Sequence, residues 1–156
     1  MSWVTSITVM LVTHDIDEAV RMADRVAVLS PGAHIEQLAS PLDIVARPAT
    51  PAVADLVGRG RTARLLALGR LERADLDQGV QQGTGGPPLT VGAELGDVLS
   101  ALVGADGPVP VLDEHGQVVG SATPATVVRA LDRLTEGDDE THPTADAGAP
   151  VGTLRT

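Results

Sequence analysis

The sequence lacks cysteine, lysine, asparagine, phenylalanine and tyrosine altogether, and Trp3 is its single large aromatic residue. Without cysteine the chain has no disulfide, no thiolate metal site and no cysteine nucleophile, which fits a cytoplasmic protein. No apolar run reaches the roughly 18 residues that a membrane-spanning helix needs, so we expect any association with a membrane to come through a partner. The net charge of −10 argues against a nucleic-acid partner.

A short apolar run near the start of the chain, residues 7–12, is rich in β-branched residues and predicts a buried strand. The strand would deliver His14 to its carboxyl end, where open α/β sheets bind ligands. Asp15 then predicts a helix N-cap, with Glu18 three residues on in the spacing of a capping box. The apolar residues that follow recur at helical spacing: Ile16, Ala19, Val20 and Ala23.

The residues around His14 read Thr-His-Asp, and Glu-Ala and Ala-Asp-Arg follow within residues 18–25. This pattern resembles the switch-histidine segment of ABC transporter ATPases. In that family the histidine hydrogen-bonds the γ-phosphate of ATP and helps to hold the attacking water, so the resemblance implies this catalytic role for His14. The alternative is a structural histidine that satisfies local backbone groups at the strand end.

Two further strands, residues 26–30 and 35–38, are predicted on either side of a Pro31-Gly32 turn. The stretches that follow resemble the end of the same nucleotide-binding domain, at residues 41–44, 47–49 and 53–58. The resemblance therefore covers residues 1–58. It implies an α/β fold, the C-terminal piece of an ABC-type P-loop NTPase domain.

The missing lysine has a direct chemical consequence, because a P-loop needs Gly-x-x-x-x-Gly-Lys to cradle phosphates. The 156 residues therefore contain no P-loop, and they contain no Leu-Ser-Gly-Gly-type signature. Asp113 and Glu114 follow an apolar run as a magnesium and catalytic carboxylate pair would, but the residues after them favour a hairpin turn. The resemblance implies ATP and Mg²⁺ in a complete family protein. We expect this chain alone to bind neither, to hold no metal and to be incomplete for hydrolysis.

Residues 59–88 form an arginine-rich segment followed by a Gly/Pro linker. The arginines could bind anionic lipid or nucleotide phosphate. Acidic residues are interleaved with them, which favours a solvated helix face instead. The five arginines are Arg59, Arg61, Arg64, Arg70 and Arg73.

Residues 89–134 show a periodicity that predicts the order β-α-β-β-α, with a hairpin at Asp113. The Val-x-Val-x-Asp-x-x-Gly-x-x-x-Gly pattern there resembles a CBS motif, a regulatory repeat that works in pairs and clasps adenosyl nucleotides. Thr123 matches a residue of the family's nucleotide site, whereas Thr126 stands where that site has an aspartate for the ribose. A packing or dimerisation role is the alternative to nucleotide binding. The acidic, Pro/Ala/Gly-rich composition of residues 135–156 predicts a disordered acidic tail.

An ABC ATPase end joined to a CBS-like unit resembles the energising subunit of osmoprotectant importers, those for glycine betaine, choline, carnitine and proline. The resemblance implies permease subunits and a second ATP-binding subunit as partners. It also implies a cytoplasmic location on the inner face of the cell membrane, held there through the permease. We expect the chain to be a C-terminal fragment of such a subunit. The alternative hypothesis is a regulatory or interaction module with a CBS-like fold and no ATPase role.

Overall fold

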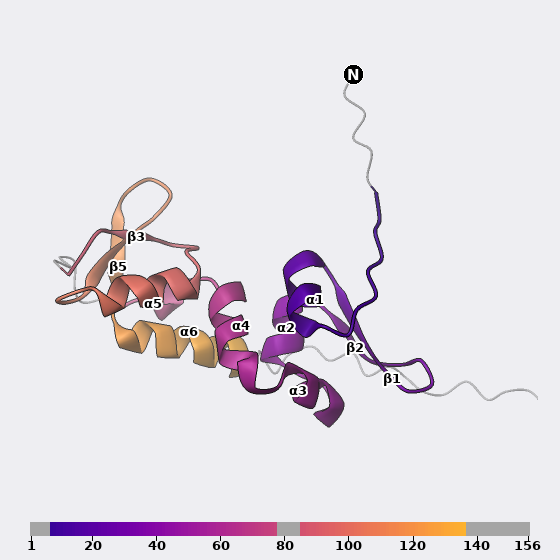
Figure 1. Cartoon of the computed structure of the whole chain (residues 1–156). Helices are drawn as coiled ribbons and strands as arrows, with labels where there is room; N and C mark the ends of the chain where they lie inside the picture. The colour runs from indigo at the N-terminus through magenta and orange to yellow at the C-terminus, as the bar shows by residue number, and fades with distance from the viewer. Residues whose placement is uncertain (1–6, 78–84, 137–156) are drawn as a thin grey trace, which may run out of the picture.

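The computed structural model describes residues 7–77 and 85–136, and it confirms the predicted mixed α/β class (Figure 1). Its elements in chain order are α1 (Ile16–Met22), β1 (Val26–Ser30), β2 (His34–Ala39), α2 (Pro41–Ala46), α3 (Pro51–Val57), α4 (Arg61–Leu68), β3 (Leu89–Thr90), α5 (Leu95–Val103), β4 (Val109–Leu112), β5 (Val118–Ala122) and α6 (Pro124–Glu136). Short 3₁₀ turns lie at Gly58–Gly60 and Arg73–Asp75. Two small sheets thus stand at either end of a helical layer.

The first sheet is the antiparallel hairpin of β1 and β2, as the two apolar runs predict. Val26 and Val28 are buried while Ala27 and Leu29 face solvent, which is the alternation of a strand with one covered side. Gly32 has φ of +87°, and Ala33 follows with φ of +60°. The turn therefore uses the left-handed region, where glycine costs least.

Residues 7–12 are not a buried strand, and the sequence prediction on this point is wrong. The segment is extended but unpaired, and its side chains are exposed, with Val9 at 81%, Met10 at 88% and Val12 at 88%. In Figure 1 it runs away from the body of the molecule. A strand is stable only when a neighbour takes up its backbone hydrogen bonds. Within the described ranges no strand pairs with this segment.

The second sheet has the order β3-β4-β5, with β3 parallel to β4 and β4 antiparallel to β5. The predicted β-α-β-β-α order of this half is confirmed, and so is the hairpin at Asp113. The Asp113 carboxylate accepts the backbone N–H of His115 at 2.9 Å and that of Gln117 at 3.0 Å. These bonds, chiefly the one from Gln117, lower the pKa of Asp113. Asp113 therefore closes a turn, as expected from the Gly-containing sequence after it.

Helix α4 lies between two halves of the described chain and joins their cores (Figure 1). The first half, residues 7–60, contains β1 and β2, and the second half, residues 69–77 and 85–136, contains β3, β4 and β5. Leu65 on α4 is buried, and so are Leu71 and Leu76 after it, so residues 61–77 pack into the fold. One cluster of buried side chains runs from Val20 in α1 to Leu134 in α6. Residues 78–84 of the predicted linker and residues 137–156 of the predicted tail lie outside the described residues. Thr135 and Glu136, predicted as the start of that tail, are instead the last two residues of α6.

Candidate functional site

His14 lies at the junction between the extended segment and α1, and its side chain is exposed. Asp15 is the N-cap of α1, because its carboxylate accepts the backbone N–H of Asp17 at 2.8 Å and that of Glu18 at 3.4 Å. The hydroxyl of Thr13 accepts the N–H of Asp15 at 3.0 Å. The two neighbours of His14 thus fix the start of the helix and leave the imidazole open to solvent.

Asp17 in the first turn of α1 forms a two-point ion pair with Arg64 on α4. Arg64 Nε lies 2.7 Å from Asp17 Oδ1, and Arg64 Nη2 lies 3.1 Å from Asp17 Oδ2. The hydrogen bond from Arg64 is the main reason why the pKa of Asp17 is lowered. An open groove of about 230 Å³ runs beside the pair. Its lining is Asp17, Val20, Arg21, Gly60, Ala63, Arg64, Ala67 and Leu68.

Arg61 and Arg64 also bind the carboxyl ends of the neighbouring helices. Arg61 donates to the carbonyl oxygens of Val45 and Ala46 at the end of α2, and Arg64 donates to that of Val57 at the end of α3. A cation is favourable there, since the last carbonyls of a helix are unpaired and carry partial negative charge. The prediction of a solvated helix face is therefore wrong for Arg61 and Arg64. These partners are backbone carbonyl oxygens 7 to 16 residues earlier in the chain, so local charge patterning gave no signal for the contacts.

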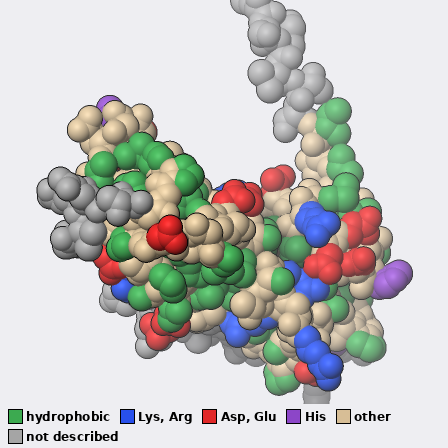
Figure 2. Space-filling view, turned by 60° about the vertical axis from the view of Figure 1, so that its left-hand side comes forward, with side chains coloured by type: hydrophobic (Ala, Val, Ile, Leu, Met, Phe, Trp, Pro, Cys, Tyr) green, Lys and Arg blue, Asp and Glu red, His purple; other side chains and the backbone are tan. Residues whose placement is uncertain are grey.

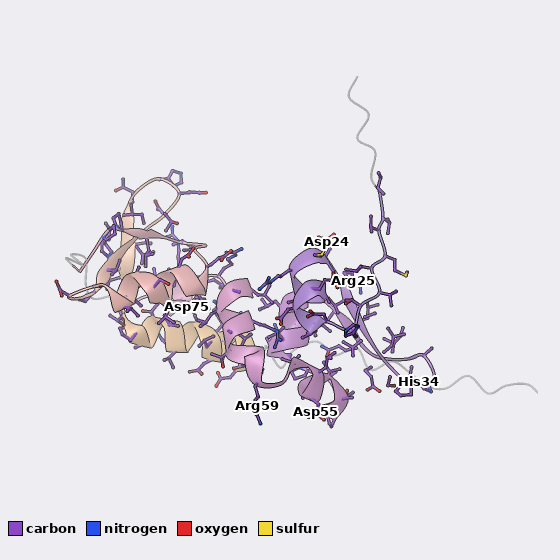
Figure 3. The ribbon with its side chains drawn as sticks, viewed as in Figure 1. Asp24, Arg25, His34, Asp55, Arg59 and Asp75 are labelled. Carbon is purple, nitrogen blue, oxygen red and sulfur yellow. The ribbon has the colours of Figure 1, made fainter. Side chains whose placement is uncertain are left out.

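The second half contains a network of ion pairs around Asp75 (labelled in Figure 3), which is 2% exposed and lies in the 3₁₀ turn that packs against α6. Arg133 on α6 donates to both carboxylate oxygens of Asp75 at 2.9 Å and to Glu72 at 2.7 Å. Arg129, one turn earlier on α6, donates to Asp77 at 2.7 Å. The spacing of the two arginines, four residues apart, indicated only that they share one face of the helix, because their acidic partners lie 52 and 58 residues earlier in the chain.

Thr123, the residue that matches the nucleotide site of CBS motifs, takes part in the same network. Its hydroxyl donates to Asp77 Oδ2 at 2.8 Å, and its backbone N–H donates to the hydroxyl of buried Thr126 at 3.0 Å. Thr126, where the family pattern has an aspartate, thus caps the first turn of α6. The polar groups of Thr123 are engaged within the chain.

His14 and Thr123 are not brought together. In Figure 1, α1 lies on one side of α4 and β5, which leads into Thr123, lies on the other. Figure 2 shows apolar side chains gathered over the second half. Exposed apolar residues there include Leu99 at 37%, Val103 at 81% and Val128 at 57%. Among the described residues, none of the helices has the length and apolar character needed to cross a membrane.

Comparisons with known proteins match the chain to ATP-binding proteins of transport systems. No protein-family model and no solved structure matches it. It is 31% identical over 127 residues to a trimethylamine N-oxide transport system ATP-binding protein of Pelagibacter ubique, covering 80% of the chain and 35% of that relative. It is 51% identical over 61 residues to an osmoprotectant import ATP-binding protein of Salmonella typhimurium, 39% of the chain and 16% of the relative. A glycine betaine/carnitine/choline transport ATP-binding protein of Bacillus subtilis is 34% identical over 87 residues, 56% of the chain and 20% of the relative.

The longest of these three matches includes parts of both halves. A match of 127 residues in a chain of 156 must reach from the first sheet into the second. The similarity is therefore not confined to the segment around His14. The chain spans about a third of the length of that relative. It is a homologue of the ATP-binding subunits of ABC importers, osmoprotectant importers among them.

Proposed function

We propose that the chain forms the C-terminal part of an ATP-binding subunit that energises an ABC importer of osmoprotectants, of the glycine betaine and proline type. The match over 80% of the chain to a trimethylamine N-oxide transport system ATP-binding protein carries this proposal. The second and third relatives named above also have osmoprotectants or quaternary amines in their names. The remaining part of the subunit would supply the P-loop, the signature and the magnesium-binding carboxylate.

His14 is the proposed switch residue of this subunit. A neutral imidazole can donate one hydrogen bond and accept another, as a group between a γ-phosphate oxygen and a water molecule must. The exposed position of His14 at the start of α1 supports this role, since a nucleotide on another part of the subunit could reach it. Mg²⁺ with ATP would neutralise phosphate charge in the complete subunit, held by groups outside these 156 residues.

One hydrogen bond from His14 cannot hold ATP by itself. Its net contribution is about 0.5–1.5 kcal/mol, whereas micromolar affinity needs about 8 kcal/mol. The isolated chain is therefore predicted to show no saturable ATP binding in calorimetry and to release no phosphate. Saturable ATP binding or turnover by the chain alone would contradict the proposal that the rest of the subunit supplies the other groups of the nucleotide site.

The partners follow from the same proposal: permease subunits, a second ATP-binding subunit, and a location at the inner face of the membrane through the permease. The proposed division is an ABC part at 1–58, a connecting segment at 59–88, a CBS-like unit at 89–134 and an acidic tail at 135–156. The exposed apolar residues Leu99, Val103 and Val128 support self-association of the CBS-like unit. In this proposal the Thr123 hydroxyl binds a nucleotide only after its hydrogen bond to Asp77 is broken.

The experiment that tests the proposal joins the chain to the part of the Pelagibacter ubique relative that lies outside the match. The fusion protein should hydrolyse ATP, while the chain and the added part alone should not. A fusion that folds and binds ATP but has no turnover would contradict the proposal. Self-association of the chain combined with an inactive fusion would instead favour a regulatory or interaction module.

A further inference from the structure

The Asp17–Arg64 ion pair joins two elements that are far apart in the sequence. Asp17 lies three residues after His14, in the first turn of α1, whereas Arg64 lies on α4. The side chain of Arg64 is only 15% exposed, and its third nitrogen donates to the carbonyl of Val57 at 2.6 Å. The guanidinium is thus held from two sides, and the two-point geometry fixes the orientation of the Asp17 carboxylate.

The other end of α4 is anchored in the second half. The carbonyl of Gly69 accepts the N–H of Leu95 at 3.1 Å, and the N–H of Leu71 donates to Ala93 at 2.9 Å. A Cβ at Gly69 would lie 2.7 Å from Leu134 Cδ1 and 2.8 Å from Leu95 Cδ1, so α5 and α6 approach this point closely. The end of α4 is therefore fixed to the second half, and Arg64 lies on the same helix.

We propose that Arg64 is a positioning residue, through which the second half of the chain sets the orientation of α1 and hence the position of His14. The inference rests on the proposed role of His14 as the switch residue. Arg64 does not touch the nucleotide in this scheme. It acts by holding Asp17, whose neighbour Asp15 caps the helix that begins directly after His14. The second half thereby becomes a regulator of the same site.

The positional part of the proposal can be measured on the full chain without ATP. The chain has no cysteine, so nitroxide labels at Met22→Cys on α1 and Ser100→Cys on α5 report one distance by electron spin resonance. Asp17→Asn and Arg64→Ala should broaden or shift the distance distribution. Asp17→Asn is the milder of the two variants and is expected to fold, because the Asp17 side chain is half exposed and asparagine has nearly the same shape as aspartate.

The matched control is Arg47→Ala. It removes the 3.0 Å ion pair between Arg47 and Asp43, which lies in the same half but joins only neighbouring turns of the chain. The distribution should stay as in the parent chain. An unchanged distribution in Asp17→Asn and Arg64→Ala would overturn the inference. Equal broadening in all three variants would overturn it as well, because the effect would not be specific to the link.

The functional part is measured in the active fusion protein. Asp17→Asn should lower kcat about 2- to 30-fold with KM for ATP unchanged, as expected for a coupling residue away from the ligand. Arg47→Ala should leave both values unchanged. An unaltered kcat in Asp17→Asn would overturn the positioning role. Full activity of the His14→Ala fusion would instead refute the proposed function, while the distance measurement would still decide whether the link exists.

Discussion

The most deeply buried charge of the described chain is Asp75, at 2% exposure. Its carboxylate is paired with Arg133 through two bonds of 2.9 Å and also accepts the backbone N–H of Glu72 at 2.9 Å. Removing one partner of such a pair leaves a desolvated charge, which costs far more than the intact pair contributes. We therefore expect the removal of Arg133 to destabilise the fold mainly because Asp75 would be left buried without a cation.

Arg133→Leu is accordingly predicted to lower the free energy of unfolding by about 3 kcal/mol. The matched variant Arg73→Leu removes an ion pair with Asp113 in which the arginine is 61% exposed. That change should cost less than about 1 kcal/mol. Urea denaturation of both variants measures the difference. Equal losses would show that the burial of Asp75 does not govern the effect.

The lowered pKa of Asp17 predicts a dependence of stability on pH. A carboxyl whose pKa is lower in the folded state adds stability above its ordinary pKa of 3.8 and loses it as the pH falls through the lowered value. Asp17→Asn should therefore be less stable than the parent chain at neutral pH, and the difference should shrink below 3.8. Denaturant titrations at both pH values measure it, with exposed Glu18→Gln as the control. A pH-independent difference would contradict the assignment.

At the scale of elements, local signals predicted most of the fold. Two apolar runs on either side of Pro31-Gly32 predicted the first hairpin, and the turn sequence after Asp113 predicted the second. Residues 7–12 form an equally apolar, β-branched run, yet no described strand pairs with them. A strand needs a neighbouring strand for its backbone hydrogen bonds, and the local sequence does not show whether one is present. The ion pair of Arg64 with Asp17 was missed for the same reason, since it joins residues 47 positions apart. The sequence predicted His14 as a site residue but not what orients its helix.

Helix α4 depends on a glycine at its end. Gly69→Ala would place a Cβ 2.7 Å from Leu134 Cδ1 and from the Leu65 carbonyl. We expect a loss of about 1–3 kcal/mol in unfolding free energy from this overpacking. Gly96→Ala on α5 is the control, because its Cβ would meet its nearest neighbour at 3.6 Å. That variant should be neutral or more stable by up to about 1 kcal/mol. A harmless Gly69→Ala would show that α4 and α6 are not in close contact.

At the scale of the whole molecule, two small folded halves share α4, and the chain spans about a third of the relative that matches most of it. The exposed residues 7–12 and the exposed His14 lie at one side, and the apolar surface of α5 and α6 lies at the other. This arrangement fits the proposal that the chain contributes His14 to a nucleotide site, while the rest of an ATP-binding subunit supplies the other groups of that site. The central proposal is that His14 acts on the γ-phosphate once those parts are present.

The most direct measurement is steady-state ATP hydrolysis by the fusion protein with His14→Ala and, separately, with His34→Ala. His34 is also exposed and lies at the tip of the β1–β2 hairpin (Figure 3), so it is a matched histidine with no proposed role. We predict that His14→Ala abolishes most of the turnover while the melting temperature stays unchanged. His34→Ala should keep full activity. Full turnover by the folded His14→Ala fusion would contradict the proposal.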